Sequence, residues 1–166
     1  AEPGAASWAG LLKARLRGGG PDGPGPRGRL YGAFVMSNCP LVAELMGCCG
    51  YDFLVVDMEH SPAGVGGALA MLQAARAAGV ACLLRVPVNR PEVIKKALDL
   101  GPEGLVVPLV GSAGEARGAA AACRYPPEGI RGVAYPMVRA SRWGLDAGYG
   151  EGASDRHLLL CQVETR

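Results

Sequence analysis

The 166-residue chain carries 17 Lys and Arg against 15 Asp and Glu, a net charge of +2. The basic residues are scattered and aromatics make up 5% of the chain, which excludes the basic stripe and the stacking platform of nucleic-acid-binding proteins. Its apolar runs are short and interrupted, whereas a membrane-spanning helix needs about 20 apolar residues. With 49% apolar residues, the sequence instead predicts a globular domain with a substantial core.

The first 29 residues differ in composition from the rest. Residues 7–17 have the apolar spacing of a short amphipathic helix, with Ser7 as its N-cap. Residues 18–28 read GGGPDGPGPRG, and a run so rich in Gly and Pro is typical of a linker. We therefore divide the chain into an N-terminal helix and linker, residues 1–29, and a single domain, residues 30–166.

From residue 30 onward, short apolar runs alternate with Ala-rich helical stretches. We expect strands at residues 31–36, 53–57, 81–86, 105–108 and 158–163, and helices at residues 41–49, 64–78, 91–100 and 112–123. The strands are continuously apolar, which is typical of a parallel sheet covered by helices. Both a doubly wound sheet and a (β/α)₈ barrel fit this order. A barrel typically needs about 250 residues, so as a barrel this chain would be incomplete.

One connection, residues 124–157, shows little apolar periodicity. Connections of this length inside compact domains are usually functional or disordered. Residues 131–143 read RGVAYPMVRASRW, and this mixture of Arg, aromatic and apolar side chains is a poor composition for disorder. The sequence therefore favours a lid or a subunit contact in this part of the chain.

Polar residues follow several of the apolar runs. Asp57 and His60 come at the end of one predicted strand, Arg85 ends the next, and Gln162 and Glu164 close the last. Because the carboxyl ends of parallel strands lie at one edge of a sheet, we expect these side chains to converge on one rim. Any one of them could be a surface residue, a helix cap or an ordinary ion pair. Their convergence favours a functional site.

The chemistry of these side chains suits proton transfer and anion binding. His60 can serve as a base near neutral pH, with Asp57 orienting its ring. Arg85 can neutralise an enolate or bind a carboxylate. Glu164 is a hard oxygen ligand suited to Mg²⁺ or Mn²⁺. His157 precedes a predicted strand instead of following one, and we interpret it as structural.

The six cysteines form no CxxC pair, and most lie inside apolar runs. Cysteine in such places behaves as a small buried hydrophobe. Reduced core thiols are therefore favoured over a disulfide framework or a zinc site. The expected compartment is the cytoplasm, and an organelle reached through a lost transit peptide is the alternative.

Several segments together resemble the HpcH/HpaI aldolase family. The run YDFLVVDMEHSP resembles the family signature, and the further segments follow in the family's order and approximate spacing: LLRVPVN, IKKALDLGPEGLVVPLV, CRYPPEGIRGV, RASRW and CQVETR. The resemblance covers residues 30–166. It implies a (β/α)₈ TIM barrel of the phosphoenolpyruvate/pyruvate type, present here up to about the fifth strand. It also implies a homo-oligomer, commonly a hexamer.

The activity implied by the resemblance is that of a metal-dependent aldehyde-lyase. Members cleave a 4-hydroxy-2-oxo acid to pyruvate and an aldehyde through a metal-stabilised enolate. They use a divalent cation, Mg²⁺, Mn²⁺ or Co²⁺, where other aldolases use a Schiff-base lysine. In agreement, Lys95 and Lys96 both fall inside a predicted helix, away from the strand ends.

The resemblance also implies roles for individual residues. His60 matches the catalytic base and Asp57 its dyad partner. Arg85 matches the residue that binds the pyruvate oxygens and stabilises the enolate, and Glu164 matches one of two carboxylate metal ligands. The second ligand of the family is an Asp on the next strand, beyond Arg166. Two further residues belong to the same site. Gln162 matches a position beside the substrate, and Glu59 a position that supports the site without contacting the substrate.

Two other functions compete with the aldolase. A lyase acting on a coenzyme A thioester, of the malyl-CoA or citramalyl-CoA type, would share the barrel and the metal carboxylates. Such enzymes usually lack the DxEH motif, so His60 counts against this alternative. A non-catalytic truncated fragment that associates with a full-length partner is the second alternative, suggested by the chain end at Arg166.

Overall fold

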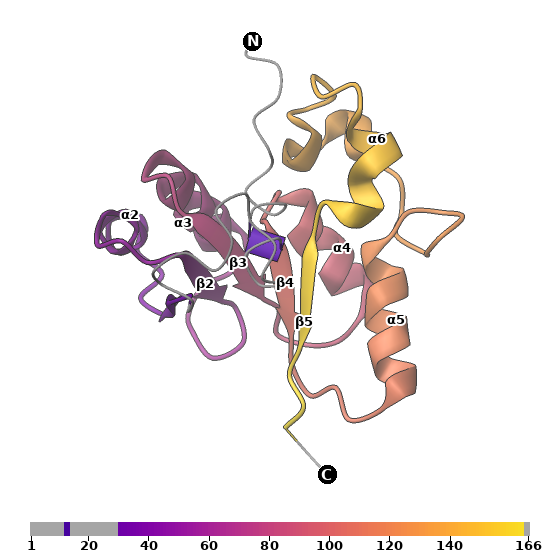
Figure 1. Ribbon diagram of the computed structural model, residues 1–166, viewed down its shortest axis with the longest axis horizontal. Coiled ribbons are helices and arrows are strands. Elements are labelled where there is room, and N and C mark those ends of the chain that lie inside the picture. The colour runs from indigo at the N-terminus through magenta and orange to yellow at the C-terminus, as the bar shows by residue number, and fades with distance from the viewer. Residues whose placement is uncertain (1–11, 14–29, 165–166) are drawn as a thin grey trace.

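The strands form one parallel sheet in which each neighbour in space is also the next strand in sequence (Figure 1). The computed structural model describes residues 12–13 and 30–164. The strands are β1 (Gly32–Val35), β2 (Phe53–Asp57), β3 (Ala81–Arg85), β4 (Gly104–Val107) and β5 (Leu158–Cys161). The first four strands are followed in turn by α2 (Pro40–Cys48), α3 (Val65–Ala77), α4 (Pro91–Asp99) and α5 (Ala113–Cys123). The predicted alternation and the α/β fold class are confirmed.

Local sequence explains where several of these helices begin. Pro40 and Pro91 stand in the first turns of α2 and α4, where a missing backbone N–H costs no helical hydrogen bond. The start of α5 is a capping box. The Ser112 hydroxyl accepts from the Glu115 backbone N–H at 3.2 Å, and the Glu115 carboxylate accepts from the Ser112 N–H at 3.1 Å. These starts agree with the predicted helices.

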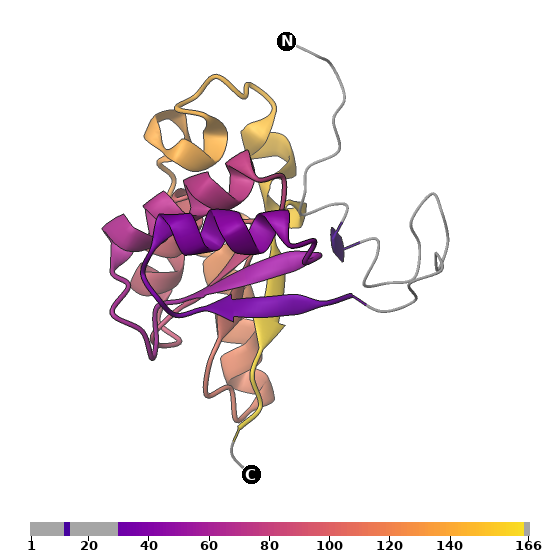
Figure 2. The ribbon, with the colours of Figure 1, turned by 90° about the vertical axis from the view of Figure 1, so that its left-hand side faces the viewer.

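The central strands β2, β3 and β4 are buried on both faces, which explains their continuously apolar sequences. Figures 1 and 2 show the helices on one side of the curved sheet. On that side Leu54 and Val56 of β2 join the main core formed with the helices. Val55 between them points to the other side, where it clusters with Leu83 and Leu12. Residues 12–13 are helical, and the rest of the helix predicted at residues 7–17 lies outside the described residues. The boundary at residue 30 stays a prediction.

The long connection, residues 124–157, is ordered and has its own small core. It contains four short helical turns: η1 (Tyr135–Met137), η2 (Arg139–Ser141), α6 (Tyr149–Gly152) and η3 (Ala153–Asp155). The ring of Tyr135 lies 5.5 Å from that of Tyr125 and 6.1 Å from that of Tyr149. Figure 1 shows α6 at the end of the sheet opposite to the C-terminus of the chain. The connection therefore does not form a lid over the carboxyl ends of these strands.

The cysteines agree only in part with the expectation of core thiols. All six are free, but Cys82 alone is buried, whereas Cys48 and Cys49 are exposed at the end of α2. Burial raises the pKa of the Cys82 thiol well above its ordinary value and keeps it protonated. Within the described part of the chain, no helix is both long and apolar enough to cross a membrane.

Candidate active site

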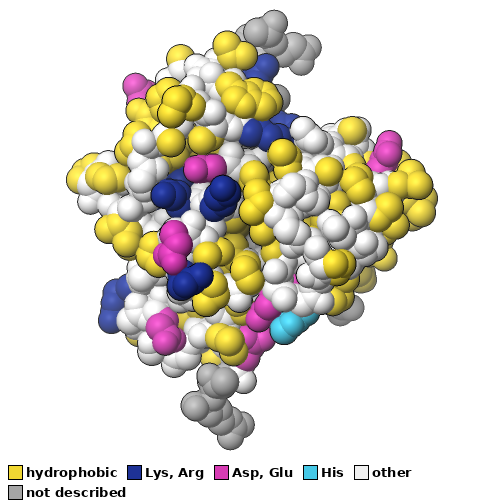
Figure 3. Space-filling model, turned by 180° about the vertical axis from the view of Figure 1, so that it is seen from behind, with side chains coloured by type: hydrophobic (Ala, Val, Ile, Leu, Met, Phe, Trp, Pro, Cys, Tyr) yellow, Lys and Arg dark blue, Asp and Glu magenta, His cyan; other side chains and the backbone are white. Residues whose placement is uncertain are grey.

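The carboxyl ends of the strands, here called the rim, bring charged side chains together as predicted. Asp57 and Arg85 are register partners at the last positions of β2 and β3. Glu164 follows β5, and its negative charge is close enough to help raise the pKa of Arg85. Figure 3 shows a histidine and acidic side chains grouped at this end of the molecule. The predicted convergence of the Asp57, Arg85 and Glu164 side chains is therefore seen in the structure.

The central contact of the rim is a bidentate ion pair. Arg85 donates from Nε to Asp57 Oδ1 at 2.9 Å and from Nη2 to Asp57 Oδ2 at 2.7 Å. Burial of the fully inaccessible Asp57 would by itself raise its pKa. Hydrogen bonds from Arg85 and from the backbone amides of Glu59 and His60 outweigh burial and hold the pKa below its ordinary value. The hydrogen bond to Asp57 likewise raises the pKa of Arg85. Both groups are held in their charged forms.

The expected contact between Asp57 and the His60 ring is not formed. Asp57 Oδ1 accepts instead from the backbone N–H groups of Glu59 at 2.9 Å and of His60 at 3.3 Å. The His60 side chain is 67% exposed, and its Nε2 lies 3.6 Å from Glu59 Oε1. The physical reason is the strand register, because a guanidinium facing Asp57 offers two donors in one plane, which an imidazole ring cannot match. Asp57 therefore orients the backbone at His60 and leaves the ring accessible.

Glu59 connects the base candidate to the arginine. Its Oε2 lies 3.3 Å from Arg85 Nε, while its Oε1 faces the His60 ring. The ring of Phe34, from β1, stacks against the Arg85 guanidinium with 4.8 Å between the guanidinium carbon and the ring centroid. Phe34 was not among the sequence candidates, because an aromatic residue inside a strand is usually explained by packing. Arg85 is thus held on three sides.

After β5, the Glu164 carboxylate accepts hydrogen bonds from two N–H donors. Glu164 Oε2 accepts from the Leu109 backbone N–H at 2.9 Å, and Gln162 Nε2 donates to Glu164 Oε1 at 3.5 Å. The other amide atom, Gln162 Oε1, is buried and has no hydrogen-bond partner among the described residues. It is an orphaned acceptor next to a carboxylate, an arrangement suited to a cation.

The charges and donor atoms of the rim fit a hard divalent cation. Three carboxylates, Asp57, Glu59 and Glu164, stand against the single guanidinium of Arg85, which leaves an excess of two negative charges. Glu164 and Gln162 offer oxygen ligands of the kind that Mg²⁺ and Mn²⁺ prefer. The described residues form no cluster of three or more His, Cys, Asp or Glu that could hold a metal ion by itself, so a cation at the rim would need further ligands.

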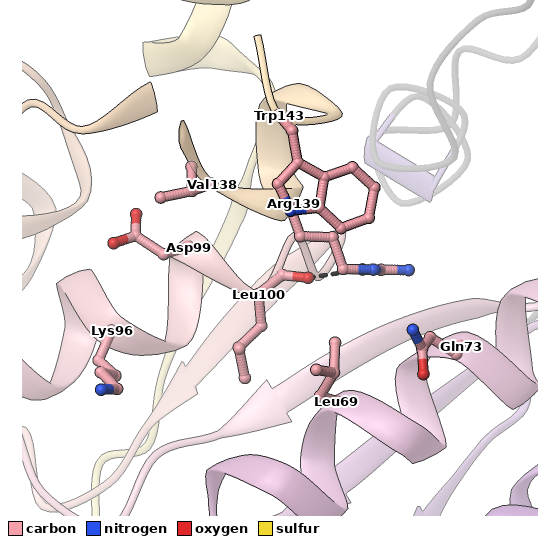
Figure 4. Close-up of a pocket in the computed structure, with 8 residues that line it drawn as sticks. All are labelled: Leu69, Gln73, Lys96, Asp99, Leu100, Val138, Arg139 and Trp143. Atoms are coloured by element: carbon pink, nitrogen blue, oxygen red, sulfur yellow. Dashed lines mark hydrogen bonds between the residues drawn. The ribbon is translucent and has the colours of Figure 1, made fainter. Parts of the chain in front are cut away.

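A separate cavity of about 330 Å³ lies away from the rim. Figure 4 shows that it opens between α3 and α4, beneath the long connection. Arg139 and Trp143 of that connection stand over Leu69 and Gln73 of α3, and Arg139 donates to the Leu100 carbonyl at 2.5 Å. No residue predicted for the site lines this cavity.

Parallel strands with charged residues at their carboxyl ends are the arrangement of enzymes built on β/α barrels. The chain belongs to the HpcH/HpaI aldolase/citrate lyase family, whose family model matches residues 30–166. The family expected from the sequence is therefore confirmed.

Two curated relatives are named as aldolases. Over 125 residues the chain is 50% identical to a hydroxypyruvate/pyruvate aldolase of Sagittula stellata, covering 75% of this chain and 49% of that protein. Over 155 residues it is 40% identical to a 4-hydroxy-2-oxo-heptane-1,7-dioate aldolase of Escherichia coli, covering 93% of this chain and 56% of that protein. The chain thus spans about half the length of the curated relatives it matches.

Two solved structures share the fold. A HpcH/HpaI aldolase/citrate lyase family protein from Burkholderia cenocepacia superposes with a TM-score of 0.83 at 36% identity, covering 93% of this chain and 59% of that one. The citrate synthase SbnG superposes with a TM-score of 0.71 at 30% identity, covering 91% and 54%. The five-stranded sheet is accordingly part of a TIM-barrel-type fold.

Proposed function

We propose that the whole protein is a metal-dependent aldehyde-lyase that cleaves a 4-hydroxy-2-oxo acid to pyruvate and an aldehyde. The observation that carries this proposal is the Asp57–Arg85 ion pair at the carboxyl ends of β2 and β3. A guanidinium held in this way can present its remaining edge to an anion. The aldolase relatives support the same reaction class.

Arg85 binds the substrate oxygens and offsets the charge of the enolate. Asp57 and Glu59 engage Nε and Nη2, and among the described residues Nη1 has no hydrogen-bond partner. The fixed guanidinium therefore offers Nη1 to a carboxylate or enolate oxygen. Preorganised donors of this kind stabilise developing charge without reorganising during the reaction.

His60 acts as the base. Its exposed ring can reach a substrate at the rim, and it removes the proton of the substrate's 4-hydroxyl group. The carbon–carbon bond then breaks, the aldehyde leaves, and the bonding electron pair remains on pyruvate as its enolate. The enolate takes up a proton to give pyruvate. Asp57 contributes by fixing the backbone at His60.

Glu164 is the protein ligand that we assign to a divalent cation, Mg²⁺, Mn²⁺ or Co²⁺, with Gln162 beside it and further oxygen ligands from outside the described residues. When bound, such an ion supplies Lewis-acid polarisation of the substrate's 2-oxo group. The orphaned Gln162 Oε1 and the excess negative charge of the rim support this assignment.

We further propose that the protein acts in the cytoplasm as a homo-oligomer, with a hexamer expected from the family. The long connection exposes large apolar side chains that suit a subunit contact: Met137, Trp143 and Leu145. The described segments do not bring these side chains to the rim, so their exposure is separate from the chemistry.

The test is pyruvate release by the whole protein with a panel of 4-hydroxy-2-oxo acids, before and after chelation and with Mn²⁺ restored. We expect release that disappears on chelation and returns with the metal. The matched variant is Arg85→Lys, which keeps the positive charge but lacks the planar guanidinium with its paired N–H donors. We expect this variant to release pyruvate far more slowly than the parent. Cleavage of malyl-CoA or citramalyl-CoA without release from any 4-hydroxy-2-oxo acid would replace the aldolase with the thioester lyase.

A further inference from the structure

The chain just after β4 contains a bulge opposite Gln162. The Gln162 N–H donates to the Val107 carbonyl at 2.9 Å, and the Gln162 carbonyl accepts from the Val110 N–H at 2.9 Å. In a regular parallel ladder, the acceptor and the donor that flank one residue belong to positions two apart. Here they are three apart, so one extra residue has been inserted between Val107 and Val110.

The extra residue releases one backbone N–H from the sheet. Pro108 has no N–H, and the N–H of Leu109 no longer belongs to the β4–β5 ladder. Leu109 adopts a left-handed backbone with φ of 54°, which is unfavourable for a residue with a side chain. Its side chain is 59% exposed, so side-chain burial does not explain this conformation.

The released N–H is directed at the rim. It donates to Glu164 Oε2 at 2.9 Å, across the gap between the chain after β4 and the chain after β5. The other carboxylate oxygen, Oε1, accepts only a long contact of 3.5 Å from Gln162 Nε2. The short hydrogen bond to Oε2 fixes the orientation of the carboxylate, and the weakly held Oε1 can still bind a further partner.

We propose that the Pro108–Leu109 bulge is a positioning device for Glu164, in which the Leu109 N–H sets the carboxylate so that Oε1 faces a bound cation. The inference rests on the proposed function, in which Glu164 is a cation ligand. Leu109 is a positioning residue, since it acts through Glu164 and touches neither the substrate nor the metal.

The test removes a single N–H in the whole protein. Replacing Leu109 by leucic acid turns its amide into an ester, which deletes the donor and keeps the side chain. We expect Mn²⁺ affinity, measured by electron paramagnetic resonance of the free ion, to fall about tenfold or more, the usual effect of losing a group that orients a metal ligand. Leu109→Gly keeps the N–H and adopts positive φ readily, so it should bind Mn²⁺ within about twofold of the parent.

A matched ester at Val110 separates positioning from sheet stability. It deletes the ladder hydrogen bond to Gln162 and leaves the Leu109–Glu164 contact in place. Equal losses of Mn²⁺ affinity with the two esters would overturn the inference, as would unchanged affinity with the Leu109 ester. Glu164→Gln must weaken Mn²⁺ binding in the same assay. If Glu164→Gln weakens Mn²⁺ binding while the Leu109 ester has no effect, only the inference fails. If Glu164→Gln has no effect on Mn²⁺ binding, the proposed cation site fails and the inference fails with it.

Discussion

Arg85 and Asp57 are 28 residues apart in sequence but occupy paired positions on β2 and β3, where two hydrogen bonds of 2.9 and 2.7 Å join them. This pair joins the ends of the two strands, and Asp57 also fixes the backbone that follows β2. Asp57 is inaccessible to solvent, and its remaining hydrogen bonds hold the backbone that carries Glu59 and His60. The stability of this end of the sheet and the geometry of the proposed site therefore depend on the same carboxylate.

Asp57→Asn should destabilise the protein and impair catalysis together. The amide keeps one acceptor oxygen but loses the negative charge, so the nearly buried charge of Arg85 loses its main ionic partner, at a cost of about 3 kcal/mol in the free energy of unfolding. Urea unfolding of the whole protein measures this loss. The matched control is Glu92→Gln, which removes an exposed partner of Arg90 and should cost less than about 1 kcal/mol. Equal losses for the two variants would contradict the central place given to Asp57.

His60→Ala should reduce the rate of cleavage by roughly 10²–10⁴-fold, the range for loss of a general base. Because His60 is not assigned as a metal ligand, Mn²⁺ affinity should remain. Steady-state kinetics and Mn²⁺ titration on the same preparation check both statements. The control is His157→Gln at the opposite end of the sheet, which should leave turnover nearly unchanged. Unaltered turnover in His60→Ala would remove His60 from the mechanism, and lost Mn²⁺ binding would make it a ligand.

His157 should make the protein sensitive to acid. Burial, followed by the nearby charge of Arg131, lowers the pKa of His157 to about 4, and its ring lies 3.3 Å from the Tyr149 hydroxyl. Between that value and the unfolded value near 6.5, the unfolded chain binds more protons than the folded one. The stabilising effect of the neutral ring is complete above pH 6.5, is lost progressively as the pH falls, and stops changing below about pH 4.

The comparison that isolates this effect is unfolding of the parent and of His157→Gln across the same pH range. The contributions of other groups cancel in the difference between the two proteins. We expect the parent to lose up to about 3 kcal/mol more than the variant over this window. Parallel stability curves would show that His157 titrates alike in the folded and unfolded states.

The Asp99–Arg131 ion pair should respond unequally to removal of its two members. Arg131 Nη2 donates to Asp99 Oδ1 at 2.7 Å, with the Arg131 side chain fully buried and that of Asp99 23% exposed. Asp99→Asn leaves a buried guanidinium without its carboxylate and should cost about 3 kcal/mol or more. Arg131→Met leaves a carboxylate that water can reach, and should cost less. Urea unfolding compares the two, and the reverse order would contradict the assignment of burial.

The fold was predictable because its signals are local. Pro at the first turn, Ser before Glu at a capping box, and continuous apolar runs are each read within a few residues. The convergence of Asp57, Arg85 and Glu164 also followed, since parallel strands deliver their ends to one edge. The choice of partner for Asp57 did not follow. It depends on which side chain faces it across β2 and β3, and on how backbone amides crowd the turn before His60.

Other features left no recognisable trace in the sequence. The bulge after β4 places Leu, not Gly, in the left-handed position, so the usual signal for positive φ is missing. Phe34 acts through the face of its ring on a guanidinium from another strand. Of the two roles expected for residues 124–157, a lid or a subunit contact, the lid does not fit their place at the other end of the sheet. Composition distinguishes order from disorder in these residues but does not say which end of the sheet they cover.

The surplus of negative charge on the rim has a kinetic consequence. At physiological ionic strength its field extends about 8 Å into solvent before ions screen it, so metal ions are drawn in faster from dilute buffer than from concentrated salt. A 2-oxo acid carries a negative charge itself and meets the same field with the opposite sign. Under the proposed function, the carboxylates of the rim therefore favour an order of arrival in which the cation enters first and the anionic substrate follows.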